Sequence, residues 1–406
     1  MRILIHTDEY YPTAAACAYR MKVLADTLAD AGNDVIVIAS STNKDNGKIE
    51  SQGGKILYSP AIKMKKKTTF MRMLNNCSFG LSSIFTSMKT GSIDVVITTS
   101  PPPLVSIPGW IIAKIKHAKL IYDVRDIWPD VAIEMGSFSE SSLYCRVFKM
   151  IANFMYKHAD LVTTVSPGKV KKINDHVKNV NKQKPSVDKV TLVSNGFDEN
   201  VLNNSIDEQL VNKYKLNERF TCVYIGNIGL AQGLDKLLDI ATNTKHKEIQ
   251  FLLFGTGAEL ELLKERVKNE NLGNVQFCGI LPHDKVLTLL SVAQISFISL
   301  KSSNMKDSIP TKVYEALGIG CPVFLVAEGD SCDIVKETGL GMCVSPDSEA
   351  SISNIFDDMV DNYGQYKKQK EFAKMLMKNK YSRQKIASDF EKKLRNWIEN
   401  NFSESQ

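Results

Sequence analysis

The stretch SIPTKVYEALGIGCPVFLV, residues 308–326, contains the start and the end of a short helix and the strand that follows it. Pro310 suits a first helical turn, because the backbone N–H that proline lacks would have no partner there, and Ser308 can cap the helix. The segment GIGCP, residues 318–322, ends the helix before the apolar run VFLV. A helix of about two turns that leads into a β-rich run predicts a domain of alternating strands and helices.

Short β-rich runs alternate with helix-period stretches along most of the chain. The strand candidates are residues 2–5, 35–38, 95–98, 120–123, 161–165 and 190–194, and then 222–225, 251–254, 275–278, 295–300, 323–326 and 341–344. Such alternation indicates parallel sheets covered by helices on both faces. The polar stretch 199–219 separates the two series and favours two doubly wound domains, residues 1–198 and 199–380, over one large sheet. We expect the two domains to face each other and ligands to bind in the cleft between them.

The last segment of the chain has a different pattern. Ile386, Phe390, Leu394 and Trp397 recur at helical spacing, with Lys and Arg on the other face. This pattern predicts a long amphipathic helix over 383–401. We expect the C-terminal segment 381–406 to return to the first domain.

The amino-acid composition indicates the general class of protein. The 406 residues are 43% hydrophobic and 24% charged, as in a soluble globular protein, and no apolar run is long enough to span a membrane. The amino terminus enters a predicted strand without a signal sequence, so we expect a cytoplasmic protein. The eight cysteines form no C-x-x-C pair and lie mostly in apolar segments. They are expected to be reduced core residues, and neither a zinc site nor a disulfide framework.

The net charge of +6 is unevenly spread, and KMKKKTTFMRML, residues 63–74, is its most basic segment. Basic residues interleaved with apolar ones suit an anionic bilayer or a phosphorylated lipid. A solvated loop followed by an ordinary amphipathic helix is the alternative. Nucleic acid is disfavoured, because no nucleic-acid-binding motif lies nearby. The candidate lipid-contacting residues are Lys65, Lys66, Lys67, Phe70 and Met71.

Three loops that follow predicted strands of the second domain are rich in glycine: GNIGLAQG at 226–233, GTGAEL at 255–260, and the opening stretch. Ligands of α/β domains bind at the carboxyl ends of the strands, so these loops indicate a nucleotide site. Ordinary strand-to-helix turns are the alternative. No G-x-G-x-x-G follows the first strand and no P-loop motif occurs, which disfavours dinucleotide oxidoreductases and P-loop NTPases.

Lys312 and Glu315 are the unusual residues of the opening stretch. The amino end of a helix and the Lys312 ammonium together favour a phosphate. A carboxylate so close to an anion site is explained if Glu315 accepts hydrogen bonds from sugar hydroxyls. The alternative is that Glu315 complements the helix dipole while Lys312 is solvated.

The segment DVRDIWPD, residues 123–130, follows a strand of the first domain. Asp126 could orient or deprotonate an acceptor there, and Arg125 could reach a phosphate. A structural Arg–Asp pair that caps a turn is the alternative. His158 is predicted to be a helix-end or packing residue, and His6, at the end of the first strand, is closer to the ligand side.

Nine motifs are spread over almost the whole chain. They are YYP with Arg20, SPPP at 100–103, DVRDIWPD at 123–130, HADLVTTVS at 158–166, SNGFD at 194–198, YIGNIGLAQGLD at 224–235, FGTGAE at 254–259, IPTKVYEALGIGCP at 309–322 and YSRQKIASDFEKKL at 381–394. Together, these motifs resemble glycosyltransferase family 4, which has the GT-B fold of two Rossmann-like domains, and more narrowly its branch that builds capsule and O-antigen repeat units.

The family carries an E-x7-E pair. The resemblance implies that Glu315 holds the ribose and that Asp307, in the first place of the pair, contacts the donor sugar. Many relatives neutralise the diphosphate with an Arg and a Lys where this chain has Asn227 and Gln232. Lys312, Arg125 and the helix amino end would then have to stabilise the leaving phosphate. Relatives also often have a glycine pair where this chain has PTAAA, residues 12–16.

On this resemblance we predict three groups of site residues and no metal ligand. The catalytic group is Asp126, Arg125 and Lys312; the donor-binding group is Asp307, Glu315, Thr311, Gly226, Asn227, Gln232, Gly255, Thr256 and Gly257; the acceptor or phosphate side has His6 and Arg20.

The resemblance implies a retaining transferase without an essential metal or other cofactor, with a UDP-sugar as co-substrate. The sugar, for which an N-acetylated amino sugar is one candidate, would pass to a polyprenyl-diphosphate-linked saccharide. The enzyme would lie on the inner face of the cell membrane, with other polysaccharide-assembly proteins as candidate partners. The alternatives are a sugar-nucleotide 2-epimerase of the same architecture and a catalytically silent sugar-nucleotide-binding subunit.

Overall fold

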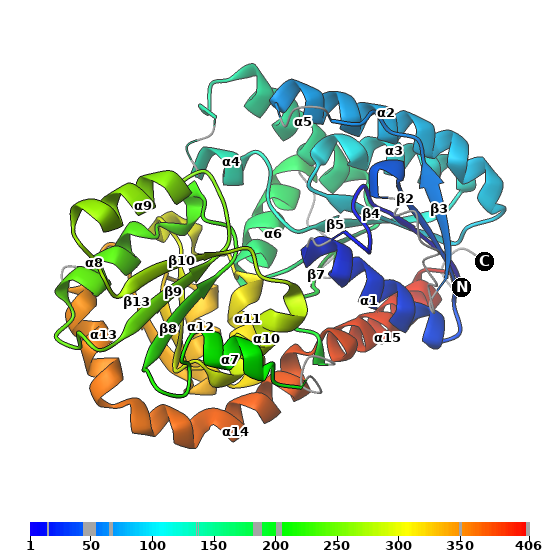
Figure 1. Ribbon diagram of the computed structural model, residues 1–406. Helices are drawn as coiled ribbons and strands as arrows, with labels where there is room; N and C mark the ends of the chain where they lie inside the picture. Colours follow the sequence, from blue (N-terminus) through cyan, green and yellow to red (C-terminus); the bar gives the residue numbers. More distant parts are fainter. Residues whose placement is uncertain are drawn as a thin grey trace. The chain divides into compact units, whose positions relative to one another are not determined.

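The computed structural model describes residues 1–13, 16–43, 54–64, 68–134, 136, 138–181, 189–199, 205–348 and 351–402. The chain forms two compact units, one made of Met1–Asn195 with Arg383–Gln406 and the other of Gly196–Ser382 (Figure 1). It therefore enters the second unit after Asn195 and returns to the first after Ser382. The predicted boundaries, 198/199 and 380/381, lie within three residues of these positions.

The described part of the first unit contains a seven-stranded parallel sheet in the order β3-β2-β1-β4-β5-β6-β7. Ile3 of the central strand pairs with Val35 on one side and Val95 on the other. This order reverses at β1, as in a Rossmann sheet, and confirms the predicted doubly wound topology. The strands are β1 Arg2–His6, β2 Asp34–Ser40, β3 Lys55–Ser59, β4 Val95–Ser100, β5 Lys119–Val124, β6 Leu161–Thr164 and β7 Val190–Leu192.

Helices cover both faces of the first sheet, which explains why its central strands are apolar on both sides. On one face Met21 and Leu28 of α1 pack with Phe390 and Leu394 of α15 over the sheet. The C-terminal helix thus packs in the first unit, as predicted. The helices are α1 Ala16–Asp30, α2 Thr69–Ser87, α3 Pro103–Lys116, α4 Asp130–Glu134, α5 Leu143–His158, α6 Pro167–Asn181 and α15 Arg383–Phe402.

The second unit contains a six-stranded parallel sheet in the order β10-β9-β8-β11-β12-β13, which is again a Rossmann order. Its strands are β8 Thr221–Ile225, β9 Gln250–Phe254, β10 Val275–Gly279, β11 Ile295–Ser299, β12 Val323–Val326 and β13 Gly341–Val344. Its helices are α7 Glu208–Lys213, α8 Asp235–Asn243, α9 Leu260–Asn269, α10 His283–Val292, α11 Thr311–Ile319, α12 Asp330–Thr338, α13 Ile352–Asp361 and α14 Tyr363–Tyr381. Each of the six strands predicted for this half is present.

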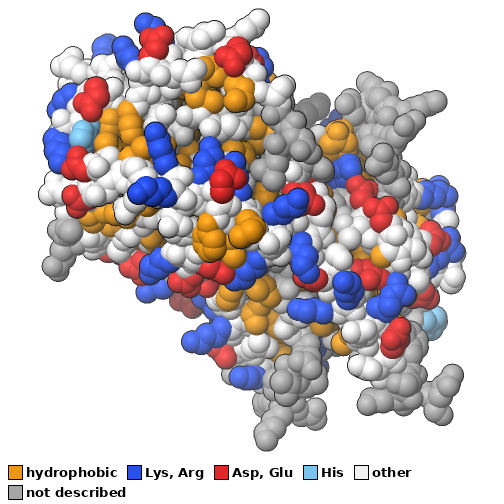
Figure 2. Space-filling model, turned by 90° about the horizontal axis from the view of Figure 1, so that it is seen from below, with side chains coloured by type: hydrophobic (Ala, Val, Ile, Leu, Met, Phe, Trp, Pro, Cys, Tyr) orange, Lys and Arg blue, Asp and Glu red, His pale blue; other side chains and the backbone are white. Residues whose placement is uncertain are grey.

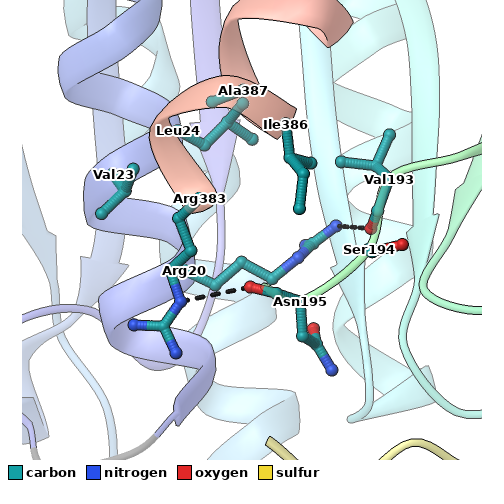
Figure 3. A pocket seen from close by; sticks show the side chains of 9 residues that line it. All are labelled: Arg20, Val23, Leu24, Val193, Ser194, Asn195, Arg383, Ile386 and Ala387. Atoms are coloured by element: carbon teal, nitrogen blue, oxygen red, sulfur yellow. Dashed lines mark hydrogen bonds between the residues drawn. The ribbon is translucent and has the colours of Figure 1, made fainter. Parts of the chain in front are cut away.

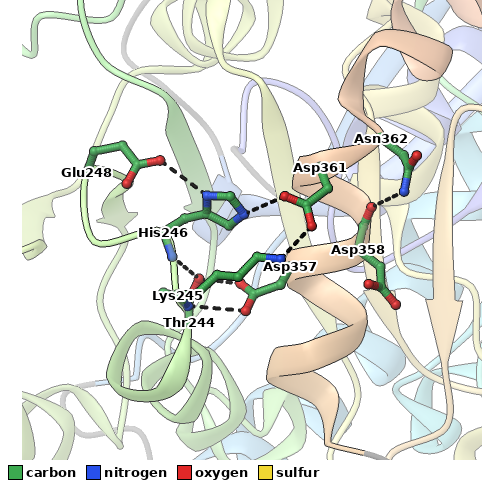
Figure 4. Close-up of polar contacts among 8 residues, drawn as sticks. All are labelled: Thr244, Lys245, His246, Glu248, Asp357, Asp358, Asp361 and Asn362. Atoms are coloured by element: carbon green, nitrogen blue, oxygen red, sulfur yellow. Dashed lines mark hydrogen bonds and ion pairs between the residues drawn. The ribbon is translucent and has the colours of Figure 1, made fainter.

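A polar network holds the loop between α8 and β9 against α13 (Figure 4). His246 Nε2 lies 3.0 Å from Asp361 Oδ1, and Lys245 Nζ donates to Asp361 Oδ2 at 2.6 Å. The Thr244 hydroxyl donates to Asp357 in the buried part of the network. This loop precedes β9, so the network stabilises the amino edge of the sheet, opposite to the edge where ligands bind in such folds.

One cysteine expectation is wrong. Cys332 of α12 and Cys343 of β13 form a disulfide, with their Cα atoms 5.7 Å apart. The two residues are separated by 11 positions in the chain, and only the packing of α12 beside β13 brings them together. The other cysteines are free, and Cys77 is exposed.

In the described ranges, no helix combines the length and the apolar character that crossing a membrane requires. On the face seen in Figure 2, basic and acidic side chains are interspersed with hydrophobic ones.

Candidate functional site

The carboxyl edge of the second sheet holds a lysine whose ammonium is buried, although the residue as a whole is partly exposed. Lys312, the second residue of α11, donates from Nζ to the Tyr224 hydroxyl at 2.7 Å and to Gln232 Oε1 at 3.2 Å. The ammonium also lies 4.1 Å from the centroid of the Tyr224 ring. The Tyr224 hydroxyl in turn donates to the backbone carbonyl of Asn227. The loop after β8 and the start of α11 are therefore joined through these side chains.

Both groups that accept from Lys312 are neutral, and this affects its charge. Burial lowers the pKa of Lys312 to about 7, while the nearby Glu315 carboxylate opposes that shift. A buried ammonium without a bonded carboxylate costs free energy, and an anion beside it would recover that cost. The arrangement therefore favours binding of a phosphate or diphosphate.

The glycines predicted to line a nucleotide site approach each other closely. A Cβ on Gly226 would lie 2.5 Å from Lys312 Cε, and one on Gly255 would lie 1.8 Å from the carbonyl oxygen of Gly226. A Cβ on Gly257 would lie 2.1 Å from the carbonyl oxygen of Ile228. These positions require glycine, so the loops after β8 and β9 pack as one layer of backbone.

Asn227 and Thr256 are exposed beside these glycines, and Gln232 is partly buried. The Thr256 carbonyl accepts from the N–H of Ile228 at 2.9 Å, which links the two loops. The predicted donor-binding residues in the loops after β8 and β9 and in α11 thus lie along the carboxyl edge of the second sheet.

Helix α11 begins differently from the prediction. Pro310, and not Ser308, is the N-cap, and the helix has no side-chain cap. It ends as predicted, with Gly320 in the left-handed region at a φ of 86°. Thr311, Lys312 and Glu315 are partly exposed, while the rest of α11 is buried. Asp307, which precedes the helix, is only 5% exposed.

In the first unit, Asp126 follows β5 and is paired with a lysine that the sequence analysis did not identify. Lys169 is buried in the first turn of α6, and its Nζ donates to Asp126 Oδ1 at 3.2 Å. The Asp126 side chain is 41% exposed. The ion pair holds the Asp126 carboxylate in place and leaves it accessible at the carboxyl edge of the first sheet.

Arg125 points into the protein beside the loop after β1. It donates from Nη2 to the Pro101 carbonyl. Asp8 lies near Arg125, and its pKa is raised to about 7 by burial and by the adjacent Glu9, against the opposing charge of Arg125. Glu9 accepts from the Cys17 thiol at 2.8 Å. Asp8 and Glu9 are site candidates that sequence reasoning missed, and their position directly after β1 was the available signal.

His6 and Arg20, predicted on the acceptor or phosphate side, lie in the core. His6 is fully buried, with Nδ1 3.1 Å from Thr98 Oγ1 and Nε2 2.9 Å from Ser83 Oγ, and it stacks on Phe79. Burial lowers its pKa to about 3, so the ring is neutral. A ring held in this way does not reach an acceptor, because no part of it meets solvent.

Arg20 forms a buried ion pair with Asp123, with contacts of 2.6 and 3.0 Å. It also donates to the Val193 carbonyl at 3.0 Å, beside the Arg383 side chain, which donates to the Asn195 carbonyl at 3.1 Å (Figure 3). Asp123 also accepts from the Thr163 hydroxyl. These contacts make Arg20 a structural residue that fixes the ends of β5 and β7 to α1.

His158 lies where the sequence predicts it. His158 is the last residue of α5, with Nδ1 2.8 Å from the Phe154 carbonyl, which confirms a helix-end role.

Of the candidate lipid-contacting residues, Lys65, Lys66 and Lys67 lie outside the described residues. Phe70 is exposed in the first turn of α2, and Met71 is partly exposed beside it. Among the described side chains, no three His, Cys, Asp or Glu residues are arranged to hold a metal ion.

Comparison with known proteins gives a family match that lies within the second unit. Residues 206–376 match the family described as Glycosyl transferases group 1. The chain is 23% identical over 383 residues to an Escherichia coli (strain K12) protein named as a colanic acid biosynthesis glycosyl transferase, WcaI. That alignment covers 87% of this chain and 91% of the relative.

Two solved structures show the same fold. Sucrose-phosphate synthase from Thermosynechococcus elongatus superposes with a TM-score of 0.80 at 16% identity, covering 98% of this chain and 100% of that one. HepE of Anabaena in complex with UDP-glucose gives a TM-score of 0.72 at 14% identity, with the same coverage. The two Rossmann-like domains of this chain are therefore those of the GT-B fold.

Proposed function

We propose that this chain, which carries a group 1 glycosyl transferase domain over residues 206–376, is a retaining glycosyltransferase of family 4. It moves a sugar from a UDP-sugar donor to a polyprenyl-diphosphate-linked saccharide during capsule or O-antigen repeat-unit assembly. The observation that carries this proposal is Lys312, an ammonium buried against the neutral oxygens of Tyr224 and Gln232 at the edge of the second sheet.

Lys312 takes the place of the charged pair that many family members have after β8. In the proposed complex it donates to the donor diphosphate, and the first-turn amides of α11 contribute partial positive charge. Glu315, one turn further along, accepts hydrogen bonds from the ribose hydroxyls. Asp307 and Thr311, beside the same turn, face the donor sugar.

The close packing of Gly226, Gly255 and Gly257 holds the loops after β8 and β9 together beside Lys312, where the diphosphate is proposed to bind. Asn227 and Thr256 are exposed beside these glycines, where their side chains can donate neutral hydrogen bonds. The choice of UDP is supported by the UDP-glucose complex of HepE, a protein of the same fold.

The chemistry needs charge stabilisation more than covalent catalysis. The bond from the sugar to the diphosphate breaks as positive charge develops on the sugar ring and negative charge on the leaving phosphate. Lys312 stabilises the leaving phosphate. The acceptor oxygen forms the new bond on the same face of the sugar, so that the anomeric configuration is retained, and its proton passes to the Asp126 carboxylate or to the departing diphosphate.

The first unit binds the acceptor in this proposal. Asp126, held by Lys169, orients or deprotonates the acceptor hydroxyl, and Arg125 contributes positive charge nearby. The lipid-linked acceptor implies that the enzyme works at the inner face of the cell membrane. The name of the relative WcaI, which refers to colanic acid biosynthesis, supports a role in polysaccharide assembly.

The test is to incubate the purified protein with a panel of UDP-sugars and a diphosphate-linked lipid saccharide, and to weigh the products by mass spectrometry. A lipid that gains the mass of one sugar residue supports transfer, and an α- or β-linkage assay by NMR then tests retention. A UDP-sugar that is isomerised without acceptor would instead support a 2-epimerase. Binding of the nucleotide without either product would support a silent subunit.

A further inference from the structure

We propose that the outer surface of helices α2 and α5 docks this protein on an anionic lipid bilayer. This surface, called the α2–α5 surface below, deepens the proposed function, because a lipid-linked acceptor lies in a membrane. It consists of exposed apolar residues on two helices of the first unit. They are Phe70, Leu74, Leu81, Phe85 and Met88 at α2, and Leu143, Val147 and Met150 on α5.

The apolar residues of α2 form a single stripe. Their successive separations of four, seven, four and three residues keep them on one side of a helix. Phe70 is 71% exposed and Phe85 is 74% exposed, so these side chains are in solvent and do not belong to the margin of the hydrophobic core. The buried residues of the same helix, Phe79 and Ser83 among them, lie on the opposite side.

Helix α5 repeats this arrangement. Leu143, Val147 and Met150 follow each other at helical spacing, and Met150 is 71% exposed. The buried side of α5 carries Cys145, Phe148, Ala152 and Met155 instead.

The two stripes belong to one layer. Helix α3 packs against both α2 and α5, and the three helices cover the same face of the first sheet (Figure 1). Phe79 of α2, Ile112 of α3 and Met155 of α5 share one core cluster beneath them. The outward sides of α2 and α5 therefore flank α3 on the surface of the unit.

The charges of this layer have one sign. Helices α2, α3 and α5, all of whose residues are described, contain no Asp or Glu. Asp and Glu make up 45 of the 406 residues of the chain, so helices of this combined length would ordinarily contain several. The basic residues on these helices and on the turn after α2 are Arg72, Lys89, Lys114, Lys116, Arg146, Lys149 and Lys157. In contrast, the face seen in Figure 2 mixes both signs.

A basic surface with apolar stripes matches the boundary of an anionic bilayer. Large apolar side chains gain free energy when they leave water, and each Lys or Arg near an anionic leaflet adds electrostatic attraction. Amphipathic helices that combine these features lie in the plane of the interface. A second copy of the chain fits less well, because face-to-face pairing would bring two surfaces of the same positive charge together.

The experiment is co-sedimentation of the full chain with vesicles. We expect binding to vesicles of phosphatidylcholine with phosphatidylglycerol, and at least about tenfold weaker binding to phosphatidylcholine alone or in high salt. The double variant Phe85→Glu/Met150→Glu should lose at least about tenfold in binding to the anionic vesicles. The matched control is Leu262→Glu, at a residue of the second unit that is 65% exposed, and it should bind like the parent.

Both sets of variants change only exposed side chains, so thermal unfolding should show unchanged stability. Equal binding to both kinds of vesicle, or equal binding by Phe85→Glu/Met150→Glu and the parent, would overturn the inference. So would a dimer in solution that the double variant abolishes. Transfer to a short-chain, water-soluble acceptor is measured in parallel. Transfer without vesicle binding contradicts only the α2–α5 surface, and vesicle binding without transfer contradicts only the proposed function.

Discussion

The Lys312 ammonium lies 2.7 Å from the Tyr224 hydroxyl and 4.1 Å from the centroid of the same ring. Tyr224 is buried in β8 and hydrogen-bonds the loop that follows this strand. One aromatic side chain thus positions both the lysine of α11 and the backbone of the β8 loop. These contacts are present without a ligand, so fewer side chains would have to become ordered when a ligand binds.

The backbone layer at this edge is expected to tolerate no side chain at Gly255. In Gly255→Ala the new Cβ would lie 1.8 Å from the carbonyl oxygen of Gly226, at a φ of +146° that L-residues rarely adopt. We expect a loss of donor binding of at least about tenfold, together with lower stability. Gly273→Ala is the control, since nothing lies within 4 Å of its Cβ position. Calorimetry with UDP and thermal unfolding measure both effects, and a Gly255→Ala protein that binds UDP like the parent would contradict the close approach.

Binding of UDP should weaken as the pH rises above about 7. Burial lowers the pKa of Lys312 to about 7 from its usual 10.5, so the unliganded side chain is mostly charged below this pH and mostly neutral above it. The diphosphate binds the charged form, so its binding raises the pKa and takes up a proton. The Kd for UDP should increase by up to about tenfold per pH unit above 7. Calorimetry in buffers of different ionisation enthalpy would detect the proton, and a parent Kd that is independent of pH between 6.5 and about 9 would refute the role of the ammonium.

Glu315 should discriminate the ribose. Hydrogen bonds to a charged group contribute about 1.5–3 kcal/mol, so Glu315→Gln should weaken binding of UDP by about tenfold or more. The parent should prefer UDP over 2′-deoxy-UDP, and the variant should have lost most of that preference. Glu261→Gln, on the exposed face of α9, is the matched control. An unchanged preference in Glu315→Gln would show that another group binds the ribose.

The buried Arg20–Asp123 pair should matter for folding. Their side chains are only 6% and 3% exposed, so removal of one partner leaves a buried charge. We expect Arg20→Met to lose about 3–5 kcal/mol in the free energy of unfolding. Lys22→Met removes a partly exposed pair with Asp26 on the same helix and should lose less than about 1 kcal/mol. Denaturant titration compares the two, and similar losses would mean that Arg20 is not the structural residue inferred from its contacts.

Much of the fold was predictable, because periodic apolar runs determine which segments become strands and helices. The exception in the first sheet is β3, an edge strand whose residues from Lys55 to Tyr58 are exposed or only partly buried and whose apolar run, ILY, is short. The disulfide between Cys332 and Cys343 was missed for a different reason. Nothing in a spacing of 11 residues shows that α12 packs beside β13.

The site was predictable where it depends on loops and helix ends, and less so where it depends on tertiary contacts. Sequence patterns identified Lys312, but not Tyr224, which lies 88 positions away and binds it. They identified Asp126 without its partner Lys169, 43 positions later. His6 was misplaced because its position at the end of β1 says nothing about Ser83 and Phe79 of α2, which enclose it.

The most direct test of the donor site is calorimetric titration of UDP into Lys312→Met at pH 6.5, compared with the parent. Lys264→Met, which changes an exposed lysine of α9, is the control. Removing a charge-assisted contact to the diphosphate should raise the Kd by at least about tenfold, while the control keeps the Kd of the parent. If Lys312→Met bound UDP as tightly as the parent, the diphosphate could not lie against this ammonium, and the proposed donor site would be wrong.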